Sequence, residues 1–209
     1  VIGATGLVGQ ALVKQLAEAE HINKIITLTR SAAQHSSAKV VNHVVDFEHL
    51  ENYSNYFKAD FLFSCLGTTL KQAGSIEAQR KVDLDYQFDA AQLAANNGVT
   101  HYLLVSSSTA NDQSKYPYAK MKGILERKIK ALPFKRISIF QPSVLMGQRE
   151  KFRLGEKMGS GLLSLLCLIP GLGRLRPITG EQVATKMVLV SDKPGAALEL
   201  FRLEEVFIN

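Results

Sequence analysis

The stretch Val1-Ile-Gly-Ala-Thr-Gly-Leu-Val-Gly9 holds three glycines at a spacing of three, where an apolar run gives way to a helical pattern. The first glycine allows a tight turn, the second leaves room for a bound group to approach the backbone, and the third lets the helix pack close to the strand. The helix would direct its free N–H groups and its dipole at an anion. In that context the stretch predicts a turn that binds a dinucleotide's diphosphate, rather than a chance cluster of glycines. The expected contact residues are Gly3, Thr5, Gly6, Leu7, Val8 and Gly9.

Runs of β-forming residues alternate with helical patterns along the chain that follows. The runs are nearly continuously apolar, which is typical of strands covered by helices on both faces. This alternation predicts the α/β class, with a Rossmann-type doubly wound parallel sheet. The expected strands are 24–29, 40–46, 60–66, 101–106 and 136–141, and the expected helices are 6–19, 76–97 and 117–131.

The length of 209 residues favours one domain with a substantial core. We expect a dinucleotide-binding core over 1–149. A small C-terminal lobe on the substrate side is expected over 150–209, which would also supply the remaining edge of the sheet. Because the chain does not begin with Met and its first strand is already under way, we also expect residues before Val1.

Composition and charge narrow the function classes. The net charge of +6 favours a phosphorylated ligand, but no basic stripe with interleaved aromatic residues predicts nucleic-acid binding. The apolar run 161–172 is too short to span a bilayer, and the histidines lack metal-ligand spacing. Cys65 and Cys167 lie in apolar surroundings, which indicates reduced thiols of an intracellular protein. We therefore expect a cytoplasmic location, no metal site and no membrane span.

The residues after the strand at 24–29 indicate which dinucleotide binds. An acidic residue there would bind the adenosine ribose of NAD, whereas arginine can bind the extra phosphate of NADP. The sequence reads Ile26-Thr-Leu-Thr-Arg-Ser31, with no acidic residue before Asp46. Arg30, with Ser31 beside it, therefore predicts NADP(H) as the cofactor, and a solvated arginine at a strand end is the alternative.

The next two strands also end in candidate cofactor contacts. Asp46 and Phe47 follow the strand at 40–46, where an acidic residue commonly meets the adenine amino group. The stretch Cys65-Leu66-Gly67-Thr68 follows the strand at 60–66, and we expect it to line the path of the cofactor.

A possible catalytic group follows the strand at 101–106. Tyr118 and Lys122 are four positions apart, so they would share one face of the helix at 117–131. An ammonium beside a phenol favours the phenolate, which lets the tyrosine exchange protons near neutral pH. The same lysine can bind the nicotinamide ribose, and the hydroxyl of Ser107 or Ser108 can hold the substrate oxygen.

Two alternatives stay open at this site. Tyr116 and Lys120 are also four apart, but Tyr116 precedes a proline and is expected outside the helix. Ser106 competes with the two serines that follow it.

Together these stretches resemble the short-chain dehydrogenases/reductases, in the atypical branch with a Gly-x-x-Gly-x-x-Gly turn. More narrowly, the chain is similar to the Tat-interacting-protein-like oxidoreductases. The matching stretches are 3–9, 44–50, 65–74, 82–86, 118–123 and 140–145.

The resemblance implies a Rossmann fold, NADP(H) binding and the serine, tyrosine and lysine roles given above. It also implies that Pro142, Ser143 and Val144 lie near the nicotinamide carboxamide. One departure is Asp83, which stands where many short-chain dehydrogenases have an asparagine that supports a proton-relay water.

We therefore expect an NADP(H)-dependent oxidoreductase that acts on a small carbonyl or alcohol, with Tyr118 as proton donor or acceptor. The alternatives are an NADPH-binding regulatory or sensor protein with little turnover, and a nucleotide-sugar epimerase or dehydratase. The last usually needs a larger C-terminal domain than residues 150–209. A small-molecule substrate is the expected partner, and the sequence leaves oligomers and protein partners open.

Overall fold

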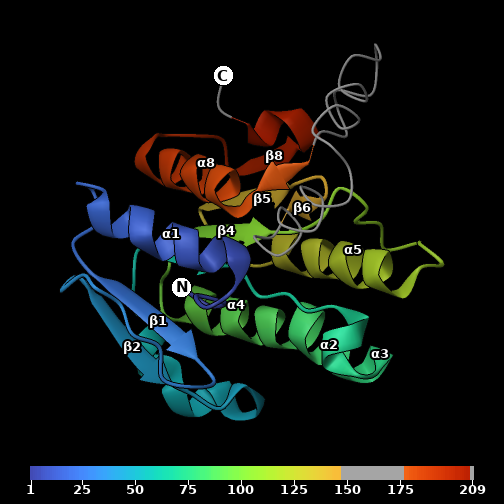
Figure 1. Ribbon diagram of the computed structural model, residues 1–209, viewed down its shortest axis with the longest axis horizontal. Helices are drawn as coiled ribbons and strands as arrows, with labels where there is room; N and C mark the ends of the chain where they lie inside the picture. Colours follow the sequence, from blue (N-terminus) through green and yellow to red (C-terminus); the bar gives the residue numbers. More distant parts are fainter. Residues whose placement is uncertain (147–176, 208–209) are drawn as a thin grey trace, which may run out of the picture.

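The computed structural model describes residues 1–146 and 177–207. Its parallel strands are flanked by helices (Figure 1), which confirms the predicted fold class. The strands are β1 (Ile25–Thr29), β2 (Val40–Val44), β3 (Phe61–Ser64), β4 (His101–Val105), β5 (Arg136–Gln141), β6 (Leu145–Met146), β7 (Ile178–Thr179) and β8 (Leu198–Arg202). The α-helices are α1 (Leu7–Glu18), α2 (Leu70–Ala73), α3 (Ile76–Arg80), α4 (Tyr86–Asn96), α5 (Pro117–Lys130) and α8 (Gly180–Asp192). The 3₁₀ segments are η1 (Phe47–Phe57) and η4 (Leu203–Val206), and η2 (Lys81–Asp85) is a π-helical turn.

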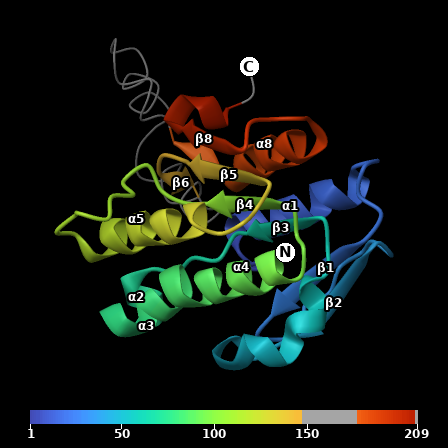
Figure 2. The same ribbon diagram turned by 180° about the vertical axis from the view of Figure 1, so that it is seen from behind.

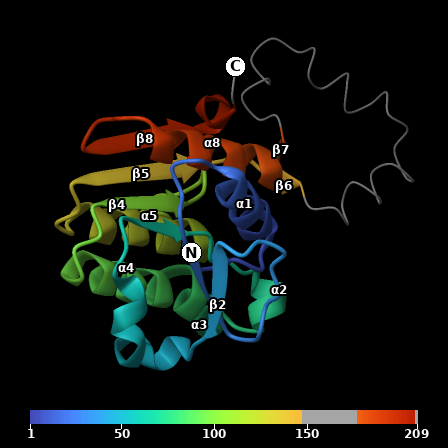
Figure 3. The same ribbon diagram turned by 90° about the vertical axis from the view of Figure 1, so that its left-hand side faces the viewer.

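Ile2 joins the two parts of the main sheet. β1 pairs with β2, and β3, β4, β5 and β8 follow one another in parallel. Ile2 forms parallel bridges to Leu28 of β1 and Ser64 of β3, so the opening stretch lies between the two groups. Figure 3 shows β8, β5 and β4 in succession. The strand β8 forms the edge beside β5, where the sequence predicted that the C-terminal part would complete the sheet.

Helices cover both faces of the sheet, as the continuous apolar runs predicted. Leu103 of β4 packs in one cluster with side chains of α1 and α8. Its neighbours Tyr102 and Leu104 point to the other face and pack with side chains of α4 and α5. Figures 1 and 2 show the two pairs of helices on opposite sides. Each side chain of β4 is therefore buried, whichever face it points to.

The close packing of α8 on α1 depends on a glycine. A Cβ at Gly180, the first residue of α8, would lie 2.6 Å from the carbonyl oxygen of Leu7. Any larger residue there would push α8 away from the first turn of α1.

Residues 147–176, including Cys167 and the apolar run 161–172, lie outside the described residues, and the separate lobe expected over 150–209 stays a prediction.

One predicted helix is divided in the structure. The pattern over 76–97 forms α3, the π-helical turn η2 and then α4. The apolar spacing is helical on each side of the π-turn, so the whole stretch was predicted as one helix, although the extra residue shifts the rotational phase between the two sides. The predicted end is confirmed, since Gly98 has a positive φ of 85°.

A polar chain links the last three strands of the sheet. His101 of β4 bonds through Nε2 to Ser138 Oγ at 2.8 Å, and Ser138 Oγ donates to Glu199 of β8 at 2.8 Å. Because the serine's single proton goes to the carboxylate, the histidine must be the donor to the serine oxygen. Arg136 completes the chain with its Nη2 at 2.8 Å from the same carboxylate. Burial, with a smaller contribution from Arg136, lowers the pKa of His101 from 6.5 to about 4.

We predict that this histidine makes the fold less stable in mild acid. Between pH 6.5 and 4 the unfolded chain binds a proton that folded His101 does not, so stability is full above pH 6.5 and falls as pH drops toward 4. The loss should be about 2 kcal/mol, allowing for solvent screening. Urea unfolding at pH 7 and pH 4.5 measures it. His101→Gln should show a smaller difference between these pH values, and an unchanged difference would contradict the assignment.

Candidate functional site

A cleft of about 1100 Å³ lies at the carboxyl ends of β1, β2 and β3. It gathers most of the residues that the sequence predicted would bind the cofactor, although they come from four separate stretches. In parallel α/β sheets ligands bind at this end of the strands. The predicted residues that line the cleft are Gly3, Thr5, Gly6, Arg30, Asp46, Phe47, Cys65, Leu66, Gly67 and Thr68.

A smaller cavity of about 250 Å³ lies at the opposite end of the strands, where Val1, Ile25 and Phe61 are among its lining residues. It contains none of the predicted cofactor or catalytic residues. The position of the glycine turn and the general placement of ligands in parallel sheets both favour the larger cleft.

The three glycines of the opening stretch have different surroundings. A Cβ at Gly3, which has a φ of 77°, would lie 2.4 Å from the backbone carbon of Cys65, and one at Gly9 would lie 2.0 Å from the oxygen of Gly3. A Cβ at Gly6 would meet only Gly3 at 3.3 Å and Cys65 at 3.9 Å. Gly3 and Gly9 are therefore required by the fold itself, whereas Gly6 borders open space in the cleft.

The first turn of α1 presents backbone donors beside Gly6. Gly6 is the N-cap of the helix and, having no side chain, makes no cap bond to the N–H groups of the first turn. The side chains of Leu7 and Val8 do not line the cleft, since Leu7 lies against α8 and Val8 is buried in the core. Any contact of these residues with a diphosphate would use their N–H groups. Ser31 also lies outside the cleft lining, and its carbonyl oxygen accepts a bond from Thr29.

One wall of the cleft is a charged cluster that the sequence did not predict. Glu48 accepts hydrogen bonds from Lys81 at 2.7 Å and from Tyr86 at 2.5 Å. These two bonds lower the pKa of Glu48, whereas burial and the bond to Glu48 raise the pKa of Tyr86 to about 12. Asp46 is oriented by accepting from the N–H of Glu48 at 2.9 Å. The partners are too far apart in sequence for spacing to reveal them.

Cys65 lies at the end of β3 with a half-buried, free side chain. Burial raises the pKa of its thiol to about 12. The thiolate is the reactive form of cysteine, so this side chain is suited to lining the cleft and not to nucleophilic chemistry near neutral pH.

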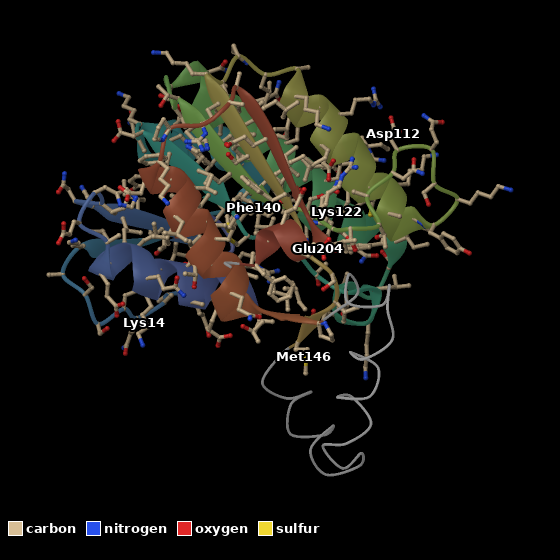
Figure 4. All side chains as sticks on the ribbon, turned by 90° about the horizontal axis from the view of Figure 1, so that it is seen from above. Lys14, Asp112, Lys122, Phe140, Met146 and Glu204 are labelled. Atoms are coloured by element: carbon tan, nitrogen blue, oxygen red, sulfur yellow. The ribbon has the colours of Figure 1, made fainter. Side chains whose placement is uncertain are left out.

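Tyr118 and Lys122 both lie on α5, as the helical spacing predicted. The Lys122 ammonium is 5.9 Å from the centre of the Tyr118 ring, and Tyr118 is 38 % exposed. Tyr116 is the N-cap of α5 and is 78 % exposed, which confirms that it precedes the helix. Lys120 is exposed. Of the two lysines, only Lys122 is held inside the protein (Figure 4).

A buried ion pair fixes Lys122. Its Nζ lies 3.0 Å from Oδ1 of Asp83, and both side chains are fully or almost fully buried. Asp83 Oδ2 accepts from the N–H of Thr68 at 3.1 Å, so this carboxylate links the lysine to the loop that lines the cleft. The π-helical turn η2 carries Asp83 to this position. The sequence identified Asp83 as a departure from the family pattern but did not predict the pair.

The three serines after β4 are held differently. Ser106 is buried and donates to Glu126 at 2.5 Å, and Glu126 also accepts from Gln141 at 2.8 Å. Ser107 Oγ lies 2.9 Å from Thr109 Oγ1, and Ser108 is exposed. The hydroxyl of Ser106 is therefore committed to Glu126, which leaves Ser107 and Ser108 as the candidates.

The loop that carries these serines packs on α5 at a glycine. A Cβ at Gly123 would lie 2.1 Å from the backbone nitrogen of Asp112, and Arg127 pairs with the Asp112 carboxylate at 3.0 Å. Figure 4 labels Asp112 beside α5. No role was predicted for Gly123, because a helical glycine reveals its neighbour only in the folded chain.

The residues after β5 lie next to the serine loop. The N–H of Ser108 donates to the carbonyl oxygen of Pro142 at 3.1 Å. Pro142 is buried, Ser143 is half-buried, and Val144 is 71 % exposed. None of the three lines the cleft described above, so their expected contact with the nicotinamide carboxamide stays a prediction.

Residues 3–134 match the sequence profile of a family described as NAD(P)H-binding. The chain belongs to this family. It is 36 % identical to Protein FMP52, mitochondrial, of Eremothecium gossypii over 92 % of this chain and 89 % of that protein. It is also 36 % identical to Protein HTATIP2 of Rattus norvegicus over 75 % of this chain and 66 % of that protein. The resemblance to the Tat-interacting-protein-like NAD(P)-binding proteins is confirmed.

Solved structures agree on the fold. MoeE5 in complex with UDP-glucuronic acid and NAD has a TM-score of 0.71 at 14 % identity, over 97 % of this chain and 74 % of that chain. A short-chain dehydrogenase/reductase superfamily protein from Agrobacterium tumefaciens with bound NAD has the same TM-score and identity, over 97 % and 76 %. The chain therefore has an NAD(P)H-binding domain with a Rossmann-type fold.

The expected cytoplasmic location was wrong. The FMP52 relatives from Eremothecium gossypii, Scheffersomyces stipitis and Saccharomyces cerevisiae are named mitochondrial, which points away from a plain cytoplasmic location. The apolar surroundings of a cysteine indicate its redox state, but they do not indicate the subcellular location of the protein. Within residues 1–146 and 177–207, no helix is long and apolar enough to cross a membrane.

We predict that the Lys122–Asp83 pair is far more costly to break than an exposed pair. Lys122→Met should lower the free energy of unfolding by about 3–5 kcal/mol, because it leaves the Asp83 carboxylate buried without a counter-charge. Adding Asp83→Asn should recover much of this loss, since the amide still accepts from Thr68. Urea unfolding of the two single variants and the double variant measures the coupling.

The exposed pair between Lys81 and Glu48 is the matched control, although its 2.7 Å separation is shorter. Lys81→Met should leave the free energy of unfolding almost unchanged, because water screens an exposed ion pair. Equal losses for Lys81→Met and Lys122→Met would contradict the role assigned to burial.

Proposed function

We propose that the chain is an NADP(H)-dependent oxidoreductase of the short-chain dehydrogenase/reductase type, which transfers a hydride to or from a small carbonyl or alcohol. The supporting observation is the buried Lys122, which lies near Tyr118 and pairs with Asp83. The buried ammonium lies between a half-exposed phenol and the lining of the proposed nucleotide cleft. This arrangement is more typical of a proton-transfer site than of an ordinary tyrosine and lysine on a surface helix.

The residues around the cleft fit the proposed cofactor. Gly6 leaves space that a Cβ would enter, and the uncapped first turn of α1 offers N–H groups to a diphosphate. Arg30 would bind the 2′-phosphate, Asp46 the adenine and Lys122 the nicotinamide ribose. When bound, the nicotinamide supplies or accepts the hydride.

The protein's own residues would handle the proton. In the reducing direction the Tyr118 hydroxyl donates its proton to the substrate oxygen as hydride reaches the carbon, and the oxidising direction reverses both transfers. The hydroxyl of Ser107 or Ser108 would hold the substrate oxygen. The Lys122 ammonium stabilises the tyrosinate that remains after the proton has left.

A second candidate is an NADPH-binding regulatory protein with little or no turnover. The Asp83 carboxylate, 3.0 Å from the Lys122 ammonium, offsets the positive charge that would stabilise a tyrosinate. The Tyr118 hydroxyl also makes no hydrogen bond to a serine within the part of the chain that the structure describes. Both observations favour slow chemistry with cofactor binding intact.

We predict that NADPH binds at least about tenfold more tightly than NADH, since the Arg30 guanidinium can form charge-assisted bonds to the 2′-phosphate. Fluorescence titration with both nucleotides measures the ratio of dissociation constants. Arg30→Ala should narrow the ratio mainly by weakening NADPH. Equal dissociation constants in the unaltered protein would reject the proposed cofactor preference.

We predict that Tyr118→Phe lowers reductase turnover by about two orders of magnitude or more, the usual scale for loss of a general acid. NADPH affinity should persist, because only a half-exposed hydroxyl is removed. The decrease in NADPH absorbance with a panel of small carbonyls measures turnover.

Tyr116→Phe is the matched control and should leave turnover near its original value, because Tyr116 precedes the helix. Loss of turnover in Tyr116→Phe alone would move the site to Tyr116 and Lys120. NADPH binding without turnover on any carbonyl would favour the regulatory candidate.

A further inference from the structure

The loop that carries Arg30 is not held by its own backbone. Residues 30–39 connect β1 to β2, and within the described chain no backbone–backbone hydrogen bond involves residues 31–36. Arg30 itself is exposed and lines the cleft. Side-chain hydrogen bonds must therefore fix the direction in which the loop leaves the sheet.

The centre of these bonds is the side-chain amide of Asn42 on β2. Its Nδ2 lies 2.9 Å from Thr27 Oγ1 and 2.8 Å from Thr29 Oγ1, the hydroxyls of two buried residues of β1. Its Oδ1 accepts from the N–H of Ala33 at 3.0 Å. One side chain thus connects two neighbouring strands with the loop that joins them.

The two threonines extend this connection to further loop residues. Thr29 Oγ1 accepts from Asn42 and donates its own proton to the carbonyl oxygen of Ser31 at 2.7 Å. Thr27 Oγ1 lies 3.3 Å from Nε2 of His35.

The loop is therefore held at every second residue, at Ser31, Ala33 and His35. Arg30 lies between Thr29 and Ser31, which are bonded to each other, so the backbone on both sides of Arg30 is fixed. Asparagine is disfavoured in strands, and here its Oδ1 bonds the loop while its Nδ2 bonds the two threonines of β1.

We propose that Asn42 is a positioning residue for cofactor selection, acting through Thr29 on the backbone of Arg30. This inference rests on the proposed NADP(H) preference. Ordering a long arginine side chain on binding loses rotamer entropy, and a fixed backbone reduces what must be ordered. The network therefore favours the nucleotide that carries a 2′-phosphate and leaves binding of NADH almost unchanged.

Two variants test the network. Asn42→Leu keeps the number and branching of the side-chain heavy atoms and removes all of the side-chain hydrogen bonds, and Thr29→Val replaces the hydroxyl that bonds Ser31 with a methyl group. Each should weaken NADPH binding about fivefold to tenfold, with the NADH dissociation constant within about twofold of its original value. Val41→Ala is the control, because Val41 is exposed on the opposite face of β2. It should change neither constant.

Fluorescence titration of each variant with NADPH and NADH gives the ratio of dissociation constants, and thermal melting confirms that each variant is folded. In an Arg30→Ala background, Thr29→Val should have no further effect on the ratio, because the network acts through Arg30. A further loss in that background would overturn the proposed route. Equal weakening of both nucleotides would also overturn it, since that is the signature of general support for the fold.

The experiment separates this inference from the function on which it rests. If Arg30→Ala narrows the ratio while Asn42→Leu and Thr29→Val leave it unchanged, the positioning role is wrong and the cofactor preference stands. If Arg30→Ala leaves the ratio unchanged, Arg30 does not carry the preference and the positioning role is wrong, whereas equal dissociation constants in the unaltered protein would reject the preference itself.

Discussion

The rest of the structure depends on three backbone segments that meet without side chains between them. Gly3 lies against the backbone of Cys65, and Gly9 lies against the carbonyl of Gly3, at distances that exclude a Cβ. This contact fixes α1 over the end of the sheet, and α8 then packs on the first turn of α1 through Gly180. The solvent-facing side of this contact, at Gly3, Gly6 and Cys65, forms the floor of the cleft. The same glycine contacts therefore hold the core together and shape the cleft.

From this floor the site extends in two directions with different physical character. Toward β1 and β2 it is an exposed surface, where Arg30 is placed by neutral hydrogen bonds. Toward α5 it becomes a dry interior, where Lys122 and Asp83 face each other. The exposed half is suited to recognising a phosphate in water. In the buried half each charge acts strongly on its neighbours, because little water screens it.

Local patterns in the sequence predicted most elements of the fold and much of the cleft. The strand β5 was predicted at its observed limits, and Arg30 and Asp46 could be placed together because parallel strands end at one edge. The Lys122–Asp83 pair and the role of Glu126 could not be predicted in this way. These interactions join residues that are far apart in the chain. Their strength depends on burial, which the spacing of residues in the sequence does not reveal.

The π-helical turn at Lys81–Asp85 has a consequence for the helical rod that contains it. In a single regular α-helix, the directions of the side chains on α3 and α4 would be set relative to one another. Which α3 residues face the cleft would then determine which α4 residues face the sheet. The wider turn breaks that phase relation. A substitution before the turn therefore does not change which residues of α4 face the sheet, and the reverse also holds. The segment therefore has two differently oriented halves, with Asp83 in the turn between them, and Tyr86 at the start of α4 still reaches the cleft.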